Sequence, residues 1–333
     1  MTPITNQNLA LEFIRVTEAA ALAAVKWVGK GDAKAADKAA TDAMRQTFNT
    51  IDFKGLVVSG EGKKDEAPQL YEGEIIGTGA GAEIDLAVDP LECTDSVSNG
   101  RPNAICVIAA GPRKSFLAAP DVYLDKIAVG PEAAGRIDLD KSVAENIKIV
   151  AEGLKKPASE VTVVVLDRPR HEDLISQIRS AGARVRLITD GDVAAAIATA
   201  RHESPIDVLL GIGGGVEGVQ AAMALKCLGG ELQARFKPKN ADQEQKLAAA
   251  GLDKLSKLNM SDLVLSDEVM FVATGVIDGP LLKGIAFDRG APISHSIVIE
   301  NQTKTIRFIE TRHVSASMAK AASKCSRVCA AEI

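Results

Sequence analysis

The segment that organises this sequence spans residues 85–94 and reads Asp85-Leu86-Ala87-Val88-Asp89-Pro90-Leu91-Glu92-Cys93-Thr94. Its first half predicts a β-strand, because apolar side chains alternate along it with two aspartates, and successive strand side chains point to opposite faces. Pro90 has no N–H to donate to a sheet, so we expect the strand to end there. The acidic turn that follows then brings Asp89, Glu92 and Thr94 together.

Carboxylates that converge on a strand end favour a hard divalent cation. Asp85 lies deeper on the strand and is expected to support such a site through hydrogen bonds. A solvated strand edge whose acids cap the turn is the alternative interpretation. Further acids favour the metal, because Mg²⁺ and Mn²⁺ prefer oxygen ligands, and the chain also offers Asp37, Glu61 and Glu217.

Length and composition narrow the possible functions. At 333 residues the chain is long for one hydrophobic core, so two subdomains are expected. Aromatic residues make up 3% and the net charge is −5, which argues against nucleic acid and anionic membranes as partners. Neither a secretion signal nor a membrane-spanning run is evident. Five cysteines without a signal indicate reduced thiols and a cytoplasmic location.

The apolar patterns predict an α/β protein. Residues 8–27 and 32–48 are expected to be helices, and helices alternate with apolar strands from about residue 140. We expect an N-terminal α/β metal-binding subdomain over residues 1–150, a C-terminal α/β subdomain with ligand-binding loops over 151–320, and a frayed tail over 321–333. Ligands bind at the carboxyl ends of parallel strands, where the second half places the loops 167–171, 190–192 and 213–217.

These loops carry groups suited to a phosphorylated sugar. Arg168 and Arg170 offer forks of donors to a phosphate, and the glycines before residue 217 open a helix whose N-terminus attracts anions. Asp190 and Asp192 could accept hydrogen bonds from vicinal hydroxyl groups. Together with the acids above, they predict metal-assisted phosphate hydrolysis, in which paired metals would neutralise the phosphate and lower the pKa of a bound water. Lys126 could meet a second phosphate, but we expect a solvated lysine there.

Short blocks occur in an order typical of one enzyme family: Ala35-Ala36-Asp37, Gly60-Glu61-Gly62, Asp65-Glu66-Ala67-Pro68, Asp89-Pro90, Ala119-Pro120-Asp121-Val122-Tyr123, Arg168-Pro169-Arg170-His171, Asp190-Gly191-Asp192 and Gly211-Ile212-Gly213-Gly214. From about Leu9 to His313 the sequence resembles the class II fructose-1,6-bisphosphatases, including the cyanobacterial fructose/sedoheptulose bisphosphatases. The resemblance implies a layered α/β sugar-phosphatase fold, related to the inositol monophosphatases, with mixed sheets and flanking helices.

The resemblance also implies the site and the reaction. Asp37 and Glu61 would serve one Mg²⁺ or Mn²⁺ ion, while Asp89, Glu92 and Glu217 would serve the other. The catalytic set would be Asp89, Thr94, Asp65 and Glu92, with Thr94 orienting the attacking water. The substrate-binding set would be Glu92, Cys93, Thr94, Tyr123, Arg168, Pro169, Arg170, Asp190, Gly191, Asp192 and Gly214. The expected reaction removes the 1-phosphate of fructose 1,6-bisphosphate, and the same site could accept sedoheptulose 1,7-bisphosphate. We expect a homodimer or a homotetramer.

The chain departs from the family pattern at residues near the expected phosphate. Cys93 stands where the family usually has glycine, and Ala33 stands where it usually has lysine, although the nearby Lys34 could supply part of the missing charge. These departures leave two alternatives open. The chain could be a divergent paralogue that acts on another phosphorylated metabolite, or a phosphosugar-binding protein with weak or no hydrolysis.

Overall fold

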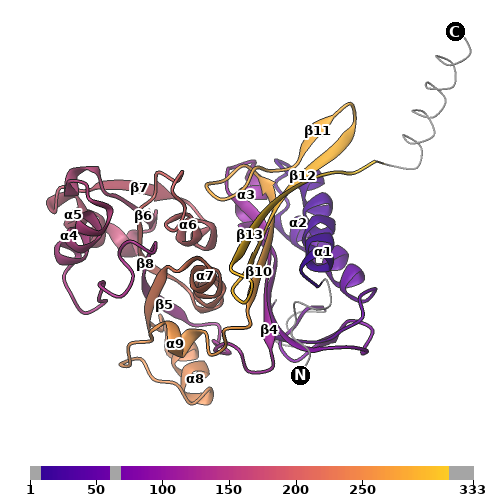
Figure 1. The fold of residues 1–333 in the computed structure, drawn as a ribbon, viewed down its shortest axis with the longest axis horizontal. Coiled ribbons are helices and arrows are strands. Elements are labelled where there is room, and N and C mark those ends of the chain that lie inside the picture. The colour runs from indigo at the N-terminus through magenta and orange to yellow at the C-terminus, as the bar shows by residue number, and fades with distance from the viewer. Residues whose placement is uncertain (1–8, 61–68, 315–333) are drawn as a thin grey trace, which may run out of the picture.

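The computed structural model describes residues 9–60 and 69–314 (Figure 1). The helices are α1 (Leu9–Ala24), α2 (Ala33–Phe48), α3 (Thr94–Asn99), α4 (Val143–Leu154), α5 (Glu172–Ser180), α6 (Asp192–Ala198), α7 (Gly215–Leu228), α8 (Ala241–Ala249) and α9 (Met260–Leu263), with short 3₁₀ turns η2 (Val25–Trp27), η3 (Ala158–Glu160) and η4 (Pro169–His171). Glu61, Asp65 and the expected tail 321–333 lie outside the described residues.

The strands form two mixed sheets. The larger sheet has eight strands, of which seven run in the order β11 (Ala286–Asp288), β12 (Ala291–Glu300), β10 (Met270–Ile277), β4 (Ala104–Pro112), β3 (Glu83–Glu92), β1 (Lys54–Ser59) and β2 (Ile75–Ile76), while β13 (Thr305–Arg312) also pairs with β12. The smaller, five-stranded sheet has the order β7 (Arg184–Ile188), β6 (Thr162–Leu166), β8 (Val208–Gly214), β5 (Tyr123–Val129) and β9 (Glu231–Phe236).

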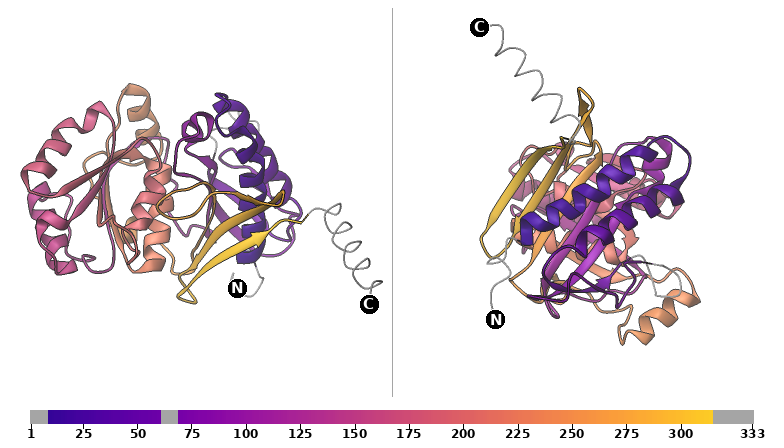
Figure 2. Two further views of the ribbon diagram at one scale, coloured as in Figure 1. Left: turned by 90° about the horizontal axis from the view of Figure 1, so that it is seen from above. Right: turned by 90° about the vertical axis from the view of Figure 1, so that its right-hand side faces the viewer.

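Helices and sheets alternate in layers (Figure 2). Helices α1 and α2 pack on the outer face of the larger sheet, where Phe13, Phe48 and Phe53 form a cluster of edge-to-face and tilted rings. Helices α6 and α7 fill the space between the sheets. Helices α4 and α5 cover the far face of the smaller sheet. This arrangement confirms the predicted layered α/β fold with mixed sheets and flanking helices.

The strands before and after residue 150 do not fall into separate sheets. Strand β5, at Tyr123–Val129, already belongs to the smaller sheet, and strands β10 to β13 return to the larger one. The return pairs the apolar strand β10 with β4, and Phe271 lies opposite Ala109 in the register. Local alternation marks a strand but does not identify its neighbour in the sheet, so the sequence alone did not place this crossing.

Strand β3 places the acidic turn, and it does not end at Pro90 as predicted. It continues to Glu92, because its pairing with β4 shifts register between Asp89 and Glu92, and this irregularity removes the need for an N–H at the proline. The alternation itself is confirmed. Leu86 belongs to the core beneath α1 and α2, whereas Ala87 belongs to the core that contains α6 and α7.

The expectation that Asp85 supports the site is wrong. Its carboxylate accepts a hydrogen bond from Arg113 Nη1 at 2.6 Å and another from the Lys114 backbone N–H at 2.6 Å. Both partners lie at the turn that follows β4, and none of the three residues lines the cavity described below. Asp85 therefore secures the end of the β3–β4 pair that lies away from the acidic turn.

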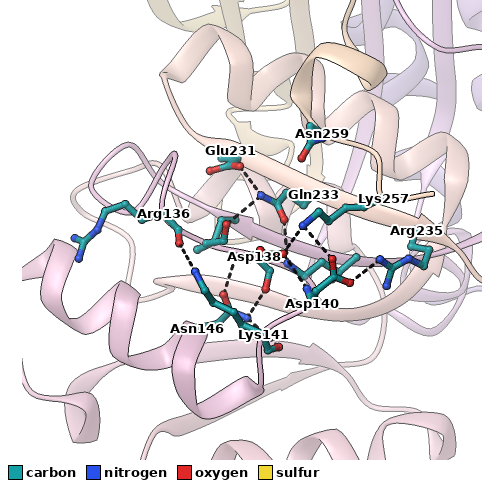
Figure 3. A network of polar contacts seen from close by, with 12 residues as sticks. Arg136, Asp138, Asp140, Lys141, Asn146, Glu231, Gln233, Arg235, Lys257 and Asn259 are labelled. Carbon is teal, nitrogen blue, oxygen red and sulfur yellow. Dashed lines mark hydrogen bonds and ion pairs between the residues drawn. The ribbon is translucent and has the colours of Figure 1, made fainter. Parts of the chain in front are cut away.

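A polar network fixes the outer edge of the smaller sheet (Figure 3). Gln233 of β9 donates to Ile137 O at 3.1 Å and accepts from Leu139 N–H at 2.9 Å. Asp140 pairs with Arg235 at 2.6 Å and with Lys257 at 3.1 Å. The network ties the loop between β5 and α4 to β9, which in turn holds β5 in place.

None of the helices within the described residues is long and apolar enough to cross a membrane.

Candidate active site

A cavity of about 800 Å³ opens where β3, α2, α6, α7 and α8 meet. It brings together many of the residues that the sequence predicted: Asp37, Asp89, Glu92, Cys93, Thr94, Asp190, Asp192 and Glu217. Tyr123, Arg168, Pro169, Arg170, Gly191 and Gly214 do not line it. These side chains come from segments far apart in the sequence, so the fold assembles one acidic cavity between the two sheets.

Glu92, at the end of β3, is a buried carboxylate with one uncompensated oxygen. Its Oε1 accepts a hydrogen bond from the Val193 backbone N–H at 3.3 Å, while its Oε2 is buried without a hydrogen-bond partner. Burial raises the pKa of Glu92 well above its ordinary value, and the neighbouring acids, with Asp192 first among them, raise it further. A buried carboxylate of this kind favours a cationic ligand.

Helix α7 presents Glu217 from its first turn, beside a buried ion pair. Burial and the charge of Asp192 raise the pKa of Glu217, whereas the ammonium of Lys126 lowers it. Lys126 Nζ lies 2.7 Å from Asp192 Oδ2, and the two side chains are only 3% and 8% exposed. Lys126 Nζ also donates to Gly214 O at 3.3 Å. A single lysine thus balances part of a crowded set of acids.

The prediction of a solvated lysine at residue 126 is therefore wrong. Strand β5 alternates, and Leu124 and Ala128 share a face with Lys126 and belong to the hydrophobic core. That alternation was the signal that could have placed Lys126 inside. The local apolar context outweighed the usual exposure of lysine because Asp192 supplies a buried partner.

Cys93 adopts a left-handed backbone conformation, with φ at 77°. Such a conformation favours glycine and costs a residue with a side chain about 1–2 kcal/mol. The loop 190–192 packs closely on Cys93, because a Cβ added to Gly191 would lie 2.9 Å from Cys93 Sγ and 1.8 Å from Asn103 Nδ2. Asn103 Nδ2 also donates to Asp190 O at 3.0 Å and to Gly191 O at 3.1 Å. Sequence reasoning missed Asn103, which lies just before β4 and joins the start of that strand to the loop 190–192.

The two arginines predicted to hold a phosphate lie beside the cavity. Arg170 donates to Ile212 O at 3.1 and 2.8 Å, and its guanidinium stacks 5.0 Å from the ring centre of Tyr123. Lys239 approaches the same ring at 4.9 Å. Tyr123 pairs with Gly214 in the sheet register, so this basic cluster adjoins the start of α7. Arg168 bonds to Asp167 O at 3.0 Å.

The cavity residues fit a divalent cation in part. Asp89, Glu92 and Glu217 supply hard oxygen donors, and Glu92 Oε2 lacks a protein partner. Within residues 9–60 and 69–314, no group of three or more His, Cys, Asp or Glu side chains could hold an ion by itself. Mg²⁺ is usually bound through one or two carboxylates together with waters and substrate phosphates, so these acids form part of a suitable shell.

Comparison with known proteins shows the family to which this chain belongs. The family described as bacterial fructose-1,6-bisphosphatase, glpX-encoded, matches residues 7–313. The chain belongs to the class II fructose-1,6-bisphosphatase family. It is 44% identical over 321 residues to the class 2 fructose-1,6-bisphosphatase of Haemophilus influenzae, covering 92% of this chain and 96% of that protein. It is also 44% identical over 320 residues to the class 2 fructose-1,6-bisphosphatase 1 of Escherichia coli K12, covering 92% and 95% respectively.

In this member of the class II family, Cys93 lies at a structurally demanding position. Because residue 93 has a positive φ, a glycine there would be free of backbone strain. Burial and the neighbouring acids raise the pKa of the Cys93 thiol, so the sulfur is held as a neutral group. The cysteine therefore adds volume, and no charge, between the acidic turn and the loop 190–192.

Proposed function

We propose that the chain hydrolyses the 1-phosphate of fructose 1,6-bisphosphate, with sedoheptulose 1,7-bisphosphate as a second substrate. The observation that carries this proposal is the single cavity that gathers Asp37, Asp89, Glu92 and Glu217 from separate elements. The names of its 44% identical relatives support the same reaction. We infer that the protein works in the cytoplasm.

We infer that hydrolysis requires Mg²⁺ or Mn²⁺, held as the family resemblance suggests. Asp37 with Glu61 would bind one ion, and Asp89, Glu92 and Glu217 would bind the other. When bound, such ions polarise a phosphoryl oxygen and activate water. The buried Oε2 of Glu92 supports this assignment, because it lacks the partner that a cation would provide.

Hydrogen bonds within the protein fix two of the proposed metal-binding acids, Asp89 and Glu92. The Val193 N–H holds Glu92 from the first turn of α6, and the Leu91 N–H binds Asp89 Oδ1 at 3.0 Å, so both acids are fixed before any ligand arrives. Thr94 would orient the attacking water, and Asp65 would assist as a further acid. The remaining substrate contacts proposed are Cys93, Tyr123, Arg168, Pro169, Arg170, Asp190, Gly191, Asp192 and Gly214.

The test is Asp89→Asn in the full chain, with Asp173→Asn on the exposed face of α5 as the control. An ion that stabilises the transition state contributes several kcal/mol, so losing its ligand should lower phosphate release at least about a hundredfold. Circular dichroism should be unchanged for both variants. Unchanged turnover of Asp89→Asn at saturating metal would refute the assignment.

The strained Cys93 favours a second candidate, a phosphosugar-binding protein with weak or no hydrolysis. Calorimetry separates the two, because a binding protein would take up fructose 1,6-bisphosphate with Mg²⁺ yet release no phosphate over hours. Restoring the family residues through Cys93→Gly with Ala33→Lys should then raise hydrolysis. Ala33 opens α2 four residues before Asp37, which places both on one helix face.

We also propose that the chain assembles as a homodimer or a homotetramer. Symmetric homo-oligomers are common among soluble enzymes. Light scattering coupled to size-exclusion chromatography measures the mass directly. A peak at the monomer mass of 34.9 kDa at micromolar concentration would contradict this proposal.

A further inference from the structure

Asn103 connects the larger sheet to the loop that carries two acids of the cavity. It lies just before β4, and its Nδ2 donates to Asp190 O at 3.0 Å and to Gly191 O at 3.1 Å. Asp190 and Asp192, on either side of Gly191, both line the cavity. One buried side chain therefore holds the backbone between two of the proposed substrate contacts.

Of these two acids, Asp190 depends on that backbone more than Asp192 does. Asp192 is fixed through its own carboxylate, because its Oδ2 lies 2.7 Å from Lys126 Nζ. The carboxylate of Asp190 instead accepts from the N–H of its neighbour Gly191 at 3.1 Å. That bond lies within the loop and does not fix the loop relative to the rest of the protein. The place of the Asp190 carboxylate is therefore set by the group that holds the two carbonyl oxygens, which is the amide of Asn103.

Asn103 is itself held firmly by the larger sheet. Its backbone N–H donates to Asp278 O at 2.8 Å, directly after β10. Asp278 Oδ1 in turn accepts from the Gly284 N–H at 2.8 Å, within the connection between β10 and β11. Gly279 packs on the asparagine, since a Cβ added there would lie 2.8 Å from Asn103 Oδ1. The amide is thus directed at the loop 190–192 by contacts that lie outside that loop.

The arrangement at Asn103 carries two energetic costs. Its backbone has φ at 73°, in the left-handed region that glycine enters freely, although asparagine tolerates it better than most residues. Within the described part of the chain, its Oδ1 is also buried without a hydrogen-bond partner. A buried acceptor without a partner typically costs about 1–3 kcal/mol. Glycine would avoid both costs, so the amide donor is what the protein gains from asparagine here, and strain of this kind gathers at functional sites.

We propose that Asn103 is a positioning residue that holds the Asp190 carboxylate where it accepts a hydrogen bond from a hydroxyl group of the substrate. This inference rests on the proposed function, in which Asp190 contacts the sugar. Asn103 does not line the cavity, so it acts through Asp190. A contact to the sugar, away from the reacting phosphate, stabilises the bound substrate and the transition state equally. Its displacement should therefore raise KM and leave kcat nearly unchanged.

The test compares Asn103→Gly and Asn103→Asp with Asn301→Gly. Glycine keeps the left-handed backbone without the amide, and aspartate keeps the shape but replaces the donor by an acceptor. Asn301 is the matched control, because it is 3% exposed and its Nδ2 donates to Asp267 O at 2.8 Å, outside the cavity. Both variants at residue 103 should raise KM for fructose 1,6-bisphosphate about tenfold and leave kcat within about threefold. Asn301→Gly should lower the urea midpoint and leave KM unchanged.

An unchanged KM in Asn103→Gly, or an equal rise in Asn301→Gly, would overturn the inference. So would a fall in kcat with KM unchanged. Calorimetric titration with fructose 6-phosphate measures the sugar contact without turnover, and Asn103→Gly should weaken binding about tenfold. Because Asn103 acts through Asp190, adding Asn103→Gly to Asp190→Ala should weaken binding no further, and a further loss would contradict this route.

The titration also separates this inference from the proposed function. If the wild-type chain releases no phosphate from fructose 1,6-bisphosphate, the proposed function fails and the binding of fructose 6-phosphate alone decides the role of Asn103. Equal binding by wild type and Asn103→Gly, or no binding by wild type, would then refute that role.

Discussion

Replacing Lys126 with methionine should destabilise the protein strongly, because it removes the cation of a buried ion pair. At an effective dielectric constant of about 20, unit charges 2.7 Å apart attract by about 6 kcal/mol, and desolvation offsets much of this. Breaking such a pair on one side typically costs about 3–5 kcal/mol, since the remaining charge stays buried. Here Asp192 would remain beside Glu92 and Glu217.

Thermal unfolding of metal-free protein, followed by circular dichroism, measures the effect. An unfolding entropy of about 2.1 cal/mol/K per residue gives about 0.7 kcal/mol/K for this chain, so Tm should fall by about 4–7 °C. Lys156→Met is the matched control, because Lys156 pairs with Asp207 at 2.6 Å but is 27% exposed, and its loss should cost less.

A second variant separates charge from packing. Adding Asp192→Asn to Lys126→Met removes the stranded carboxylate and should recover part of the lost stability. If Lys126→Met lowers Tm by less than about 1 °C, or by no more than Lys156→Met does, the ion pair is not the stabilising feature described here.

Other predictions concern the residues around the site. Burial lowers the pKa of His171 below its ordinary 6.5, so the folded state favours the neutral ring, whose Nε2 accepts from the Ile212 N–H at 2.8 Å. This contribution to stability should be lost progressively as the pH falls below about 6.5, and His171→Asn should flatten that part of the stability curve. Cys93→Gly should change stability by no more than about 1 kcal/mol in urea unfolding, because relief of positive φ offsets lost packing. Gly191→Ala should unfold at lower urea concentration than wild type and lose activity, since its new Cβ would meet Asn103 Nδ2, and an unchanged midpoint would contradict this packing.

Much of the fold was predictable because its signals are local. Asp32 caps α2 through the Ala35 N–H at 2.9 Å, where the sequence predicted a helix to begin. The loops at the ends of β6, β7 and β8 also fall where the apolar strands stop. These features depend on neighbouring residues in the chain, and such neighbours are visible in the sequence.

What the sequence could not predict depends on partners far along the chain. Asp85 and Asp89 share a strand face and a residue type, yet Asp85 meets Arg113 while Asp89 lines the cavity. Lys126 is buried because Asp192, from another element, reaches it. Asn103 and Lys246 carry no motif of their own, and only the packing of loops and of α8 brings them to the site.

The return of β10 to the larger sheet has a consequence for synthesis on the ribosome. Strand β4 pairs with β3 on one side, but its other neighbour, β10, is made roughly 160 residues later. At about 5–20 residues per second, the apolar edge of β4 would wait about 10–30 s for its partner. The nascent N-terminal half therefore carries an open strand edge, which makes this interval the period when the chain most needs protection from aggregation.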